Sequence, residues 1–347
     1  MPDDGGNHLS DRVVDVAVVG AGAAGCAAAA TLARAGRSVL LLDARLDGFR
    51  VGEGAPPGLG RLLEEIFGAG AFDSGAHIPC PSIVSAWGSP EPGVVEHVLN
   101  PLGHAWNLDR KRFDADLRSA AARLGVELRE GRYPVDAPPA RLVIDASGRG
   151  ARFARRQGAR TRHLYRLVSL WAVWTAEHDQ DARLHLEAVE HGWWYSVLLP
   201  GGRRMVMYLT DADLLPDDRA GLAESARGLD LIGPLLRGHI VAGPGVCSAR
   251  TSRLEPFAGD GWLAAGDAAC AFDPLSGRGI VAALLTGRSA GLGADGLLSG
   301  RSAGEEHEQL LSALFADTLA EREETYAAET RWPESPFWAR RCSSVLA

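Results

Sequence analysis

The sequence predicts an α/β fold of two lobes with a C-terminal helical segment, and three observations support this prediction. The chain has 347 residues, which is enough for two lobes at roughly 150 residues per domain. Near its start, a β-branched apolar run, a glycine-rich turn and an alanine-rich segment follow one another in the order of a βαβ unit. From 166 to 210 the pattern changes to long β-rich stretches joined by turns, which is typical of an antiparallel sheet.

The first unit carries the spacing Gly-x-Gly-x-x-Gly. A buried strand is predicted over 13–19, and the turn after it contains Gly20, Gly22 and Gly25. In such a unit the first glycine permits the tight turn, the second lets backbone approach a pyrophosphate, and the third allows close packing of helix on sheet. The next strand ends at Asp43, where an acid can accept hydrogen bonds from a ribose. This Rossmann-like half therefore favours FAD or NAD over NADP.

A second glycine-rich loop lies far downstream, in the stretch GDAACAFDPLSGRGI at 266–280. A buried strand is predicted over 261–267, and a helix from about Gly279. Gly277 and Gly279 let backbone pass close to a flat ligand, and a helix N-terminus offers unpaired N–H groups to an anion. Helix capping alone explains such a loop about equally well. Only the combination with the first glycine turn points to a bound dinucleotide.

Taken together, these motifs resemble those of the FAD-dependent monooxygenases of the para-hydroxybenzoate hydroxylase fold. That family has Gly-x-Gly-x-x-Gly near the start, an arginine in a middle helix, an Asp-x-x-Gly strand end, and a late Gly-Asp strand followed by a proline- and glycine-rich loop. The chain contains all four in order, with Arg110 in LDRKRFD, Asp145 to Gly148, and Gly266-Asp267 completing the set.

The resemblance implies a bound FAD. Asp43 would hold the adenosine ribose, Arg110 the FAD backbone, Asp267 the ribityl or pyrophosphate region, and 274–279 would line the isoalloxazine. The residues that the resemblance places against FAD are Gly20, Gly22, Ala23, Ala24, Gly25, Asp43, Ala44, Arg45, Gly52, Glu53, Arg110, Ala146, Gly148, Gly266, Asp267, Pro274, Ser276, Gly277, Arg278, Gly279 and Ile280.

The same resemblance implies a discontinuous division of the chain. The FAD-binding domain would comprise 1–75, 105–160 and 250–300, the substrate domain 76–104 and 161–249, and the C-terminal helical segment 301–347. The chain departs from the family in one respect, because 131–141 leaves room only for a stub where the family carries a β-meander.

Within the fold, RVGEGAPPGLGRLL at 50–63 and the tail RWPESPFWARR resemble the branch that contains tryptophan halogenases and the flavoproteins that mature quinone cofactors. Halogenases of this branch depend on a lysine and on a W-x-W-x-I-P segment. The only lysine of the chain is Lys111, inside the middle-helix motif, and the corresponding segment reads Trp193, Tyr195, Val197 and Leu198. Oxygen transfer is therefore the expected chemistry.

The predicted activity is hydroxylation of an aromatic substrate, an indole or a phenol, through a flavin hydroperoxide, with O2 as co-substrate. NAD(P)H would supply electrons directly or through a partner flavin reductase. The cofactor-maturing relatives favour a tryptophan side chain on a peptide, protein or carrier. The alternatives are a halogenase-like enzyme, a flavin dehydrogenase or reductase of the same fold, and a flavin-binding accessory protein without activity.

Five aromatic side chains of the β-rich segment could stack a substrate ring over the flavin or fill the core. Trp194 is the first candidate for a catalytic role, by strand alternation and the family segment. The full set is Trp171, Trp174, Trp193, Trp194 and Tyr195.

The candidate bases are Glu53, His104 and His191. Glu53 lies in a strap that resembles the halogenase loop between flavin and substrate. We therefore expect a cofactor contact or a gating role for Glu53 in preference to a catalytic one.

Charge and cysteine usage exclude other classes. The net charge is −8 and the pI about 5.7, so no nucleic-acid partner is expected. Five cysteines without a C-x-x-C pair indicate neither a disulfide framework nor a zinc site, and we expect no metal. Without a secretory signal or a spanning apolar segment, the expected location is the cytoplasm, away from membranes. The tail at 331–341 is expected to form either a docking surface or a core edge.

Overall fold

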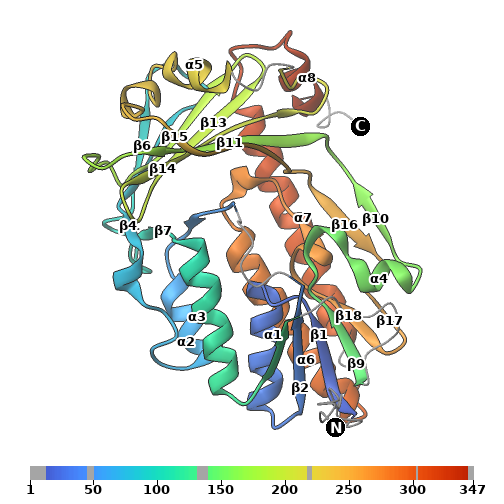
Figure 1. Cartoon of the computed structure of the whole chain (residues 1–347). Helices are drawn as coiled ribbons and strands as arrows, with labels where there is room; N and C mark the ends of the chain where they lie inside the picture. The colour runs from blue at the N-terminus through green and yellow to red at the C-terminus, as the bar shows by residue number, and fades with distance from the viewer. Residues whose placement is uncertain (1–12, 45–50, 131–139, 217–220, 302–303, 343–347) are drawn as a thin grey trace, which may run out of the picture.

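The computed structural model describes residues 13–44, 51–130, 140–216, 221–301 and 304–342, and these residues form two lobes (Figure 1). We call the lower one in this view the Rossmann lobe. Its sheet has the order β17-β18-β9-β1-β2-β8, parallel except for β17. The strands are β1 Val14–Val19, β2 Val39–Asp43, β8 Glu127–Glu130, β9 Ala140–Asp145, β17 Ala258–Gly259 and β18 Trp262–Ala264. The Rossmann-like fold predicted from the sequence is confirmed.

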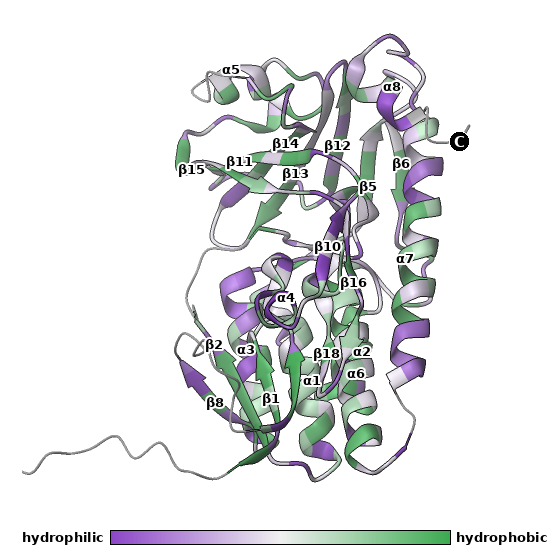
Figure 2. Cartoon of the chain, turned by 90° about the vertical axis from the view of Figure 1, so that its right-hand side faces the viewer, coloured by the Kyte–Doolittle hydropathy of each residue, from purple (hydrophilic) through white to green (hydrophobic). Residues whose placement is uncertain are grey.

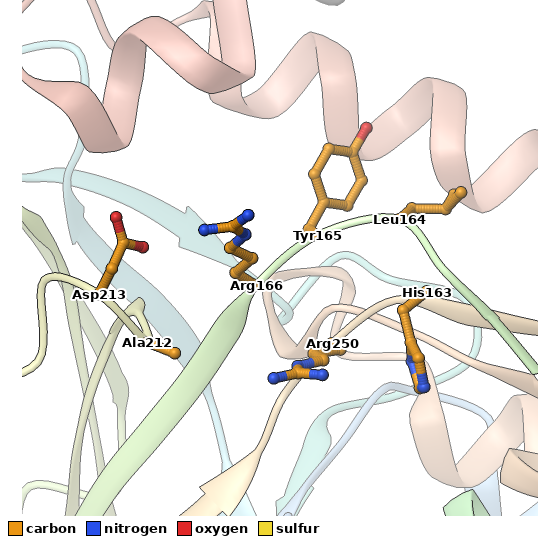
Figure 3. A pocket seen from close by; sticks show the side chains of 7 residues that line it. All are labelled: His163, Leu164, Tyr165, Arg166, Ala212, Asp213 and Arg250. Atoms are coloured by element: carbon orange, nitrogen blue, oxygen red, sulfur yellow. The ribbon is translucent and has the colours of Figure 1, made fainter.

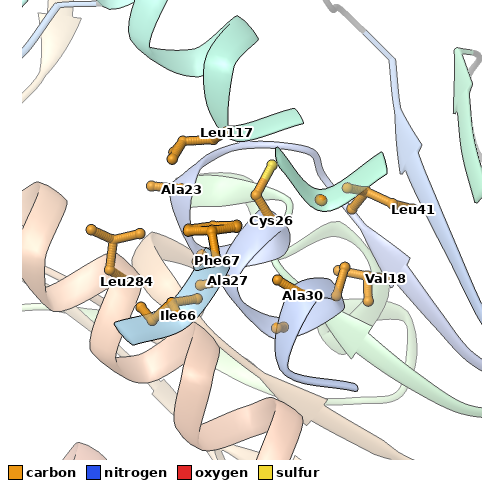
Figure 4. Packing of buried hydrophobic residues seen from close by; sticks show 14 of the residues in the cluster. Val18, Ala23, Cys26, Ala27, Ala30, Leu41, Ile66, Phe67, Leu117 and Leu284 are labelled. Atoms are coloured by element: carbon orange, nitrogen blue, oxygen red, sulfur yellow. The ribbon is translucent and has the colours of Figure 1, made fainter. Parts of the chain in front are cut away.

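Helices cover this sheet, and two of them pack unusually closely. A Cβ added at Gly287 would lie 2.2 Å from the carbonyl oxygen of Ala24, and one at Gly291 would lie 2.8 Å from that of Ala28. The resulting core, shown in Figure 4, joins both helices to the sheet. The helices of the lobe are α1 Ala23–Arg34, α2 Leu59–Phe67, α3 Arg110–Arg123, α4 Arg152–Arg156 and α6 Gly279–Leu298.

The other lobe is built on a seven-stranded sheet, which we call the upper sheet. Its order is β15-β11-β14-β13-β12-β5-β6, and only the β5–β12 pair is parallel, so the predicted antiparallel sheet is confirmed. Its strands are β5 Ser82–Ala86, β6 Gly93–Glu96, β11 Leu167–Thr175, β12 Leu184–Val189, β13 Gly192–Leu199, β14 Arg203–Asp211 and β15 Ile240–Ser248. Helix α5, Leu222–Arg227, covers its outer face.

Two small sheets join the lobes. One has the order β3-β7-β4 and the other β10-β16-β19, so strands from before and after the upper sheet meet beneath it. Their bounds are β3 Gly54–Ala55, β4 Ile78–Cys80, β7 Ala105–Asn107, β10 Arg160–His163, β16 Ser252–Glu255 and β19 Cys270–Ala271. The predicted stub at 131–141 lies mostly outside the described residues, because only 140 and 141 are described.

The C-terminal segment forms α7, Gly304–Ala327, and α8, Pro336–Cys342. Figure 2 shows α7 running beside both lobes. Phe337 and Trp338 are almost fully buried, and the indole nitrogen of Trp338 donates a 3.0 Å hydrogen bond to the carbonyl of Val189. These two side chains therefore form a core edge, one of the two roles expected for this tail. None of the helices within the described ranges has the length and apolar character to cross a bilayer.

Candidate active site

The glycine turn after β1 leaves the first turn of α1 without a side-chain cap. Gly22 is the N-cap residue, and it has no side chain that could accept a hydrogen bond from the N–H groups of the first turn. Ala23 and Ala24 are the first two residues of that turn. Gly20 has φ +108°, and a Cβ there would lie 2.3 Å from the carbonyl oxygen of Ala146. A Cβ at Gly25 would lie 1.8 Å from the carbonyl oxygen of Gly20. Uncapped N–H groups and close backbone are the features that a phosphate requires.

The carboxyl ends of β1, β2 and β9 meet at the same edge of the sheet. Asp43 ends β2 and is buried, and Ala44 beyond it is exposed. Arg45 lies outside the described residues. Ala146 and Gly148 follow β9, whose last residue pairs with the end of β1. The three segments predicted to hold FAD therefore border one edge.

Asp145, the first residue of the Asp-x-x-G motif, has a structural role. Its carboxylate is fully buried and accepts hydrogen bonds of 2.8 to 2.9 Å from the backbone of Ser147, Phe153 and Ala154. These bonds tie the end of β9 to the first turn of α4. The motif therefore shapes the backbone that carries Ala146 and Gly148.

The second glycine loop approaches the first. Gly266 has φ +60°, and a Cβ there would lie 2.6 Å from that of Ala24, so the two glycine turns touch. Asp267 is paired with Arg149 at 3.3 Å. The Gly266-Asp267 turn, which the resemblance places against the ribityl or pyrophosphate region of FAD, therefore lies against the start of α1.

Beyond Asp267, the loop exposes bare backbone. Pro274–Ser276 form a short 3-10 turn, Arg278 is the N-cap of α6, and no side chain caps that helix; Ile280 is buried in its first turn. A Cβ added at Gly277 or Gly279 would meet nothing within 4 Å. Open space beside uncapped backbone is what a flat ring lying on this loop requires.

Arg110 fastens the strap at 51–53, which we define as Val51, Gly52 and Glu53. Its guanidinium donates hydrogen bonds of 3.0 and 2.8 Å to the carbonyls of Val51 and Gly52, and its Nε is buried with no partner. Gly52 has φ +100°, which favours glycine. An orphaned guanidinium nitrogen, two uncapped helices and open space over a glycine loop together fit a dinucleotide such as FAD.

The Glu53 carboxyl of the strap has a raised pKa. Its side chain is 3% exposed, and burial raises its pKa to about 7 although Arg110 and the Gly52 N–H, which donates a 2.9 Å bond, act in the opposite direction. The phenol oxygen of Tyr195 on β13 lies 3.1 Å from the position that a Cβ of residue 54 would take. Burial and the Glu53 carboxyl raise the pKa of Tyr195. A proton-accepting carboxyl and a neutral phenol thus meet beneath the upper sheet.

Strand alternation divides the predicted aromatic set between two faces. Trp193 and Tyr195 belong to the inner face, together with Trp171 and with Val51 and Leu275 from the Rossmann lobe. Trp174 and Trp194 belong to the outer face under α5. Trp194 is 4% exposed and stacks on Tyr208, with ring centroids 4.8 Å apart. The structure therefore does not bring Trp194 together with Glu53, because neighbours in a strand point to opposite faces.

The two candidate histidines lie elsewhere. His104 makes an edge contact with Trp106 beside β7, and His191 lies in the turn between β12 and β13, where its Nδ1 is 3.3 Å from the hydroxyl of Ser335. In the part of the chain that the structure describes, no group of three or more His, Cys, Asp or Glu residues is arranged to hold a metal.

Sequence reasoning missed one buried network. Asp273, at the start of the second glycine loop, accepts 3.0 Å hydrogen bonds from Arg322 Nε and the Tyr326 hydroxyl. The indole N–H of Trp193 donates to the same hydroxyl at 3.0 Å. A signal existed in the helical stretch of 304–327, which carries an arginine and a tyrosine at i and i+4 on one face.

Comparisons with known proteins show which proteins this chain is similar to. Residues 18–80 match the model of the NAD(P)-binding Rossmann-like domain. The chain is 26% identical to a protein of Marinomonas mediterranea named as an FAD-dependent oxidoreductase, LodB, over 94% of this chain and 96% of that protein. Its fold is similar to that of the myxobacterial chondrochloren halogenase CndH, with a TM-score of 0.85 and 22% identity over 95% of this chain and 86% of the other.

A further solved structure with this fold is QhpG, a peptidyl tryptophan dihydroxylase essential for tryptophylquinone cofactor biogenesis. The TM-score is 0.80, and the two chains are 29% identical over 95% of this chain and 79% of QhpG. The recognition of this branch from the sequence motifs is confirmed.

Proposed function

The chain is an FAD-dependent oxidoreductase of the halogenase and hydroxylase type, and from this premise we propose that it is a monooxygenase that hydroxylates the indole ring of a tryptophan side chain carried on a peptide or protein. The observation that carries the proposal is the 29% identity, over 95% of the chain, to a peptidyl tryptophan dihydroxylase. NAD(P)H supplies the electrons, directly or through a partner flavin reductase, and O2 is the co-substrate.

The placement of the single lysine favours oxygen transfer over halogenation. Lys111 is exposed near the start of α3 in the Rossmann lobe, whereas the inner face of the upper sheet presents Tyr195 and Val197. Halogenases that resemble this chain depend on a lysine between the Gly-Glu loop and the middle helix, and this chain has none there. The chain has no second lysine to supply that group.

When bound, FAD would supply the chemistry of oxygen activation and transfer. The chain's own residues would bind and orient the cofactor: the uncapped first turn of α1 would hold the pyrophosphate, and Gly277 and Gly279 would border the ring. The apolar inner face, with Trp171 and Leu275, excludes water from the ring of the substrate. Glu53 is suited to take a proton from that ring on a carboxylate oxygen, because a base with a pKa near 7 is half ionised at neutral pH.

The test is a mass measurement on a blocked tryptophan peptide under 18O2, with FAD-loaded enzyme that excess NAD(P)H and an added flavin reductase keep reduced. We expect the product to gain labelled oxygen catalytically, with a higher kcat/KM than free tryptophan, because remote parts of the substrate supply the binding energy that positions the ring. Added bromide should leave no bromine in the product.

Each rival function has its own outcome in this experiment. A bromine isotope pattern would establish a halogenase, and reduction of a double bond without oxygen uptake would establish a reductase. One equivalent of product per enzyme, or none, would leave a flavin-binding accessory protein. Equal kcat/KM for free and peptide-borne tryptophan would remove the macromolecular substrate and keep the monooxygenase.

A further inference from the structure

A pocket of about 600 Å³ opens where three strands of the upper sheet end, beside the linker from the Rossmann lobe. It lies before β11, after β14 and after β15, and its lining residues are His163, Leu164, Tyr165, Arg166, Ala212, Asp213 and Arg250 (Figure 3).

The pocket is positively charged although the whole chain is acidic. Figure 3 shows the guanidinium groups of Arg166 and Arg250 pointing to the same side. Asp213 is bound by Arg340 at 2.7 Å, and this bond, with a smaller effect from the nearby Arg166, lowers the pKa of the Asp213 carboxyl. Among the residues that the structure describes, no carboxylate lies within ion-pair distance of Arg166 or Arg250, and the Nε of Arg250 is buried with no partner.

The pKa of His163 reflects the same positive charge. Its pKa is lowered by burial, and the nearby Arg250, Arg149 and Arg155 lower it further. His163 is therefore mostly neutral near pH 7, and two arginines supply the cationic groups of the lining. Guanidinium groups bind the two oxygens of a carboxylate with directed hydrogen bonds.

The pocket wall is attached at two points to the second glycine loop, which is expected to hold FAD. The guanidinium carbon of Arg322 lies 3.6 Å from the ring centroid of Tyr165, and Arg322 also binds Asp273 of the second glycine loop. On the other side, Arg149 donates to the carbonyl of Arg250 and is paired with Asp267. A ligand in this pocket would therefore lie next to the flavin region.

The end of β15 connects the pocket to Glu53. Burial raises the pKa of Cys247, and both Arg149 and Glu53 are near enough to shift it, the first downward and the second upward. Cys247 is three residues before Arg250. The pocket thus lies close to the space beneath the upper sheet.

From this arrangement we propose that Arg166 and Arg250 bind a carboxylate side chain that flanks the target tryptophan in the peptide, which rests on the proposed function. The substrate class becomes an acidic tryptophan peptide. A nucleotide phosphate is the competing occupant. Asp213 at the rim disfavours a doubly charged phosphate more than a single carboxylate, because like charges repel.

The experiment measures binding to the FAD-loaded enzyme by fluorescence anisotropy. The probe is a short blocked peptide with a central tryptophan and a glutamate at each end, and its neutral counterpart carries glutamine at both ends. The test variant is Arg166→Gln with Arg250→Gln. The matched control is Arg162→Gln, which removes a positive charge from an exposed position on β10 that does not line the pocket.

We expect the wild type and Arg162→Gln to bind the acidic peptide about tenfold more tightly than the neutral one, and the double variant to lose that difference. Unchanged binding of the neutral peptide would show that the double variant is folded. Equal affinity of wild type and double variant for the acidic peptide would overturn the inference. So would NADPH or inorganic phosphate binding that depends on these arginines while the acidic peptide does not bind.

Because peptide binding is measured without turnover, the proposed function and the pocket assignment can be contradicted independently of each other. An acidic peptide that binds through the arginines but is never hydroxylated contradicts the proposed function and leaves the pocket assignment intact. A peptide that the double variant hydroxylates with an unchanged kcat/KM contradicts the pocket assignment and leaves the function intact.

Discussion

The hydroxyl of Tyr326 on α7 donates a 3.0 Å hydrogen bond to Asp273, which begins the loop before α6. Trp193 on β13 donates to the same hydroxyl, and Arg322 donates to the same carboxylate oxygen. All four side chains are buried. One phenol therefore links the second glycine loop, the C-terminal helix and the upper sheet.

Tyr326→Phe should lower both stability and FAD affinity. It removes a hydrogen bond to a carboxylate and leaves the indole N–H of Trp193 buried without an acceptor, which together cost about 1 to 3 kcal/mol. The loop that would carry the flavin also loses one of its polar contacts with α7. Urea unfolding of the FAD-free protein and titration with FAD measure the two effects.

Tyr208→Phe is the matched control. Tyr208 donates a 2.9 Å hydrogen bond to the carbonyl of His191 from the outer face of the upper sheet. We expect a similar loss of stability with an unchanged Kd for FAD. If Tyr326→Phe also leaves the Kd unchanged, the network has no bearing on the flavin loop.

Gly279→Ala should weaken FAD binding without destabilising the FAD-free protein. The added methyl group meets nothing within 4 Å in the protein itself, and alanine favours the first turn of a helix by up to about 1 kcal/mol over glycine. A flavin ring lying on this backbone would be displaced. Gly304→Ala at the first residue of α7 is the control, because it makes the same change at a helix start away from the loop. Equal FAD affinity of both variants would place the ring elsewhere.

Glu53→Gln should change how stability depends on pH. The carboxyl has a pKa of about 7 in the folded protein against 4.5 as the ordinary value, so below about pH 4.5 it is neutral in both states and has no effect. As the pH rises towards 7, the unfolded chain ionises first and the free energy of unfolding falls. Above pH 7 the free energy of unfolding stays lower by a constant amount, about 3 kcal/mol.

The variant should therefore equal the wild type near pH 4.5 and exceed it at pH 8. Urea unfolding of the FAD-free proteins at both values gives the difference, in which all other titrating groups cancel. Stability curves that run parallel across this range would show that Glu53 is not buried as a perturbed acid.

The motifs predicted the Rossmann lobe well because each of them is local. Gly25 is required by its close approach to the carbonyl of Gly20 within a single βαβ unit, so a short stretch of sequence is enough. The inner and outer faces of the upper sheet could not be derived this way. Alternation separates Trp193 from Trp194, but only the packing of α5 and the Rossmann lobe decides which face meets the flavin region.

The partners of Asp273 were hidden for a related reason. Arg322 and Tyr326 lie about fifty residues downstream, on a helix whose orientation depends on tertiary packing. A buried acid in a glycine loop suggests a partner without identifying it. Spacing within the chain gives no information on contacts of that kind.

Trp194 and Tyr195 are neighbours in β13 and point to opposite faces of the upper sheet, so their substitutions should have different effects. Trp194→Phe should lower stability by about 1 to 3 kcal/mol, because it leaves space beside Tyr208 in a packed cluster, and should leave kcat/KM for the tryptophan peptide unchanged. Tyr195→Phe removes the hydroxyl next to the strap and should lower kcat and shift its pH profile, since that phenol and the Glu53 carboxyl influence each other. Steady-state kinetics from pH 6 to 9, beside urea unfolding, measures both. A loss of kcat/KM with Trp194→Phe that exceeds the loss with Tyr195→Phe would mean that the substrate meets the outer face, and the placement of the reaction beneath the upper sheet would be wrong.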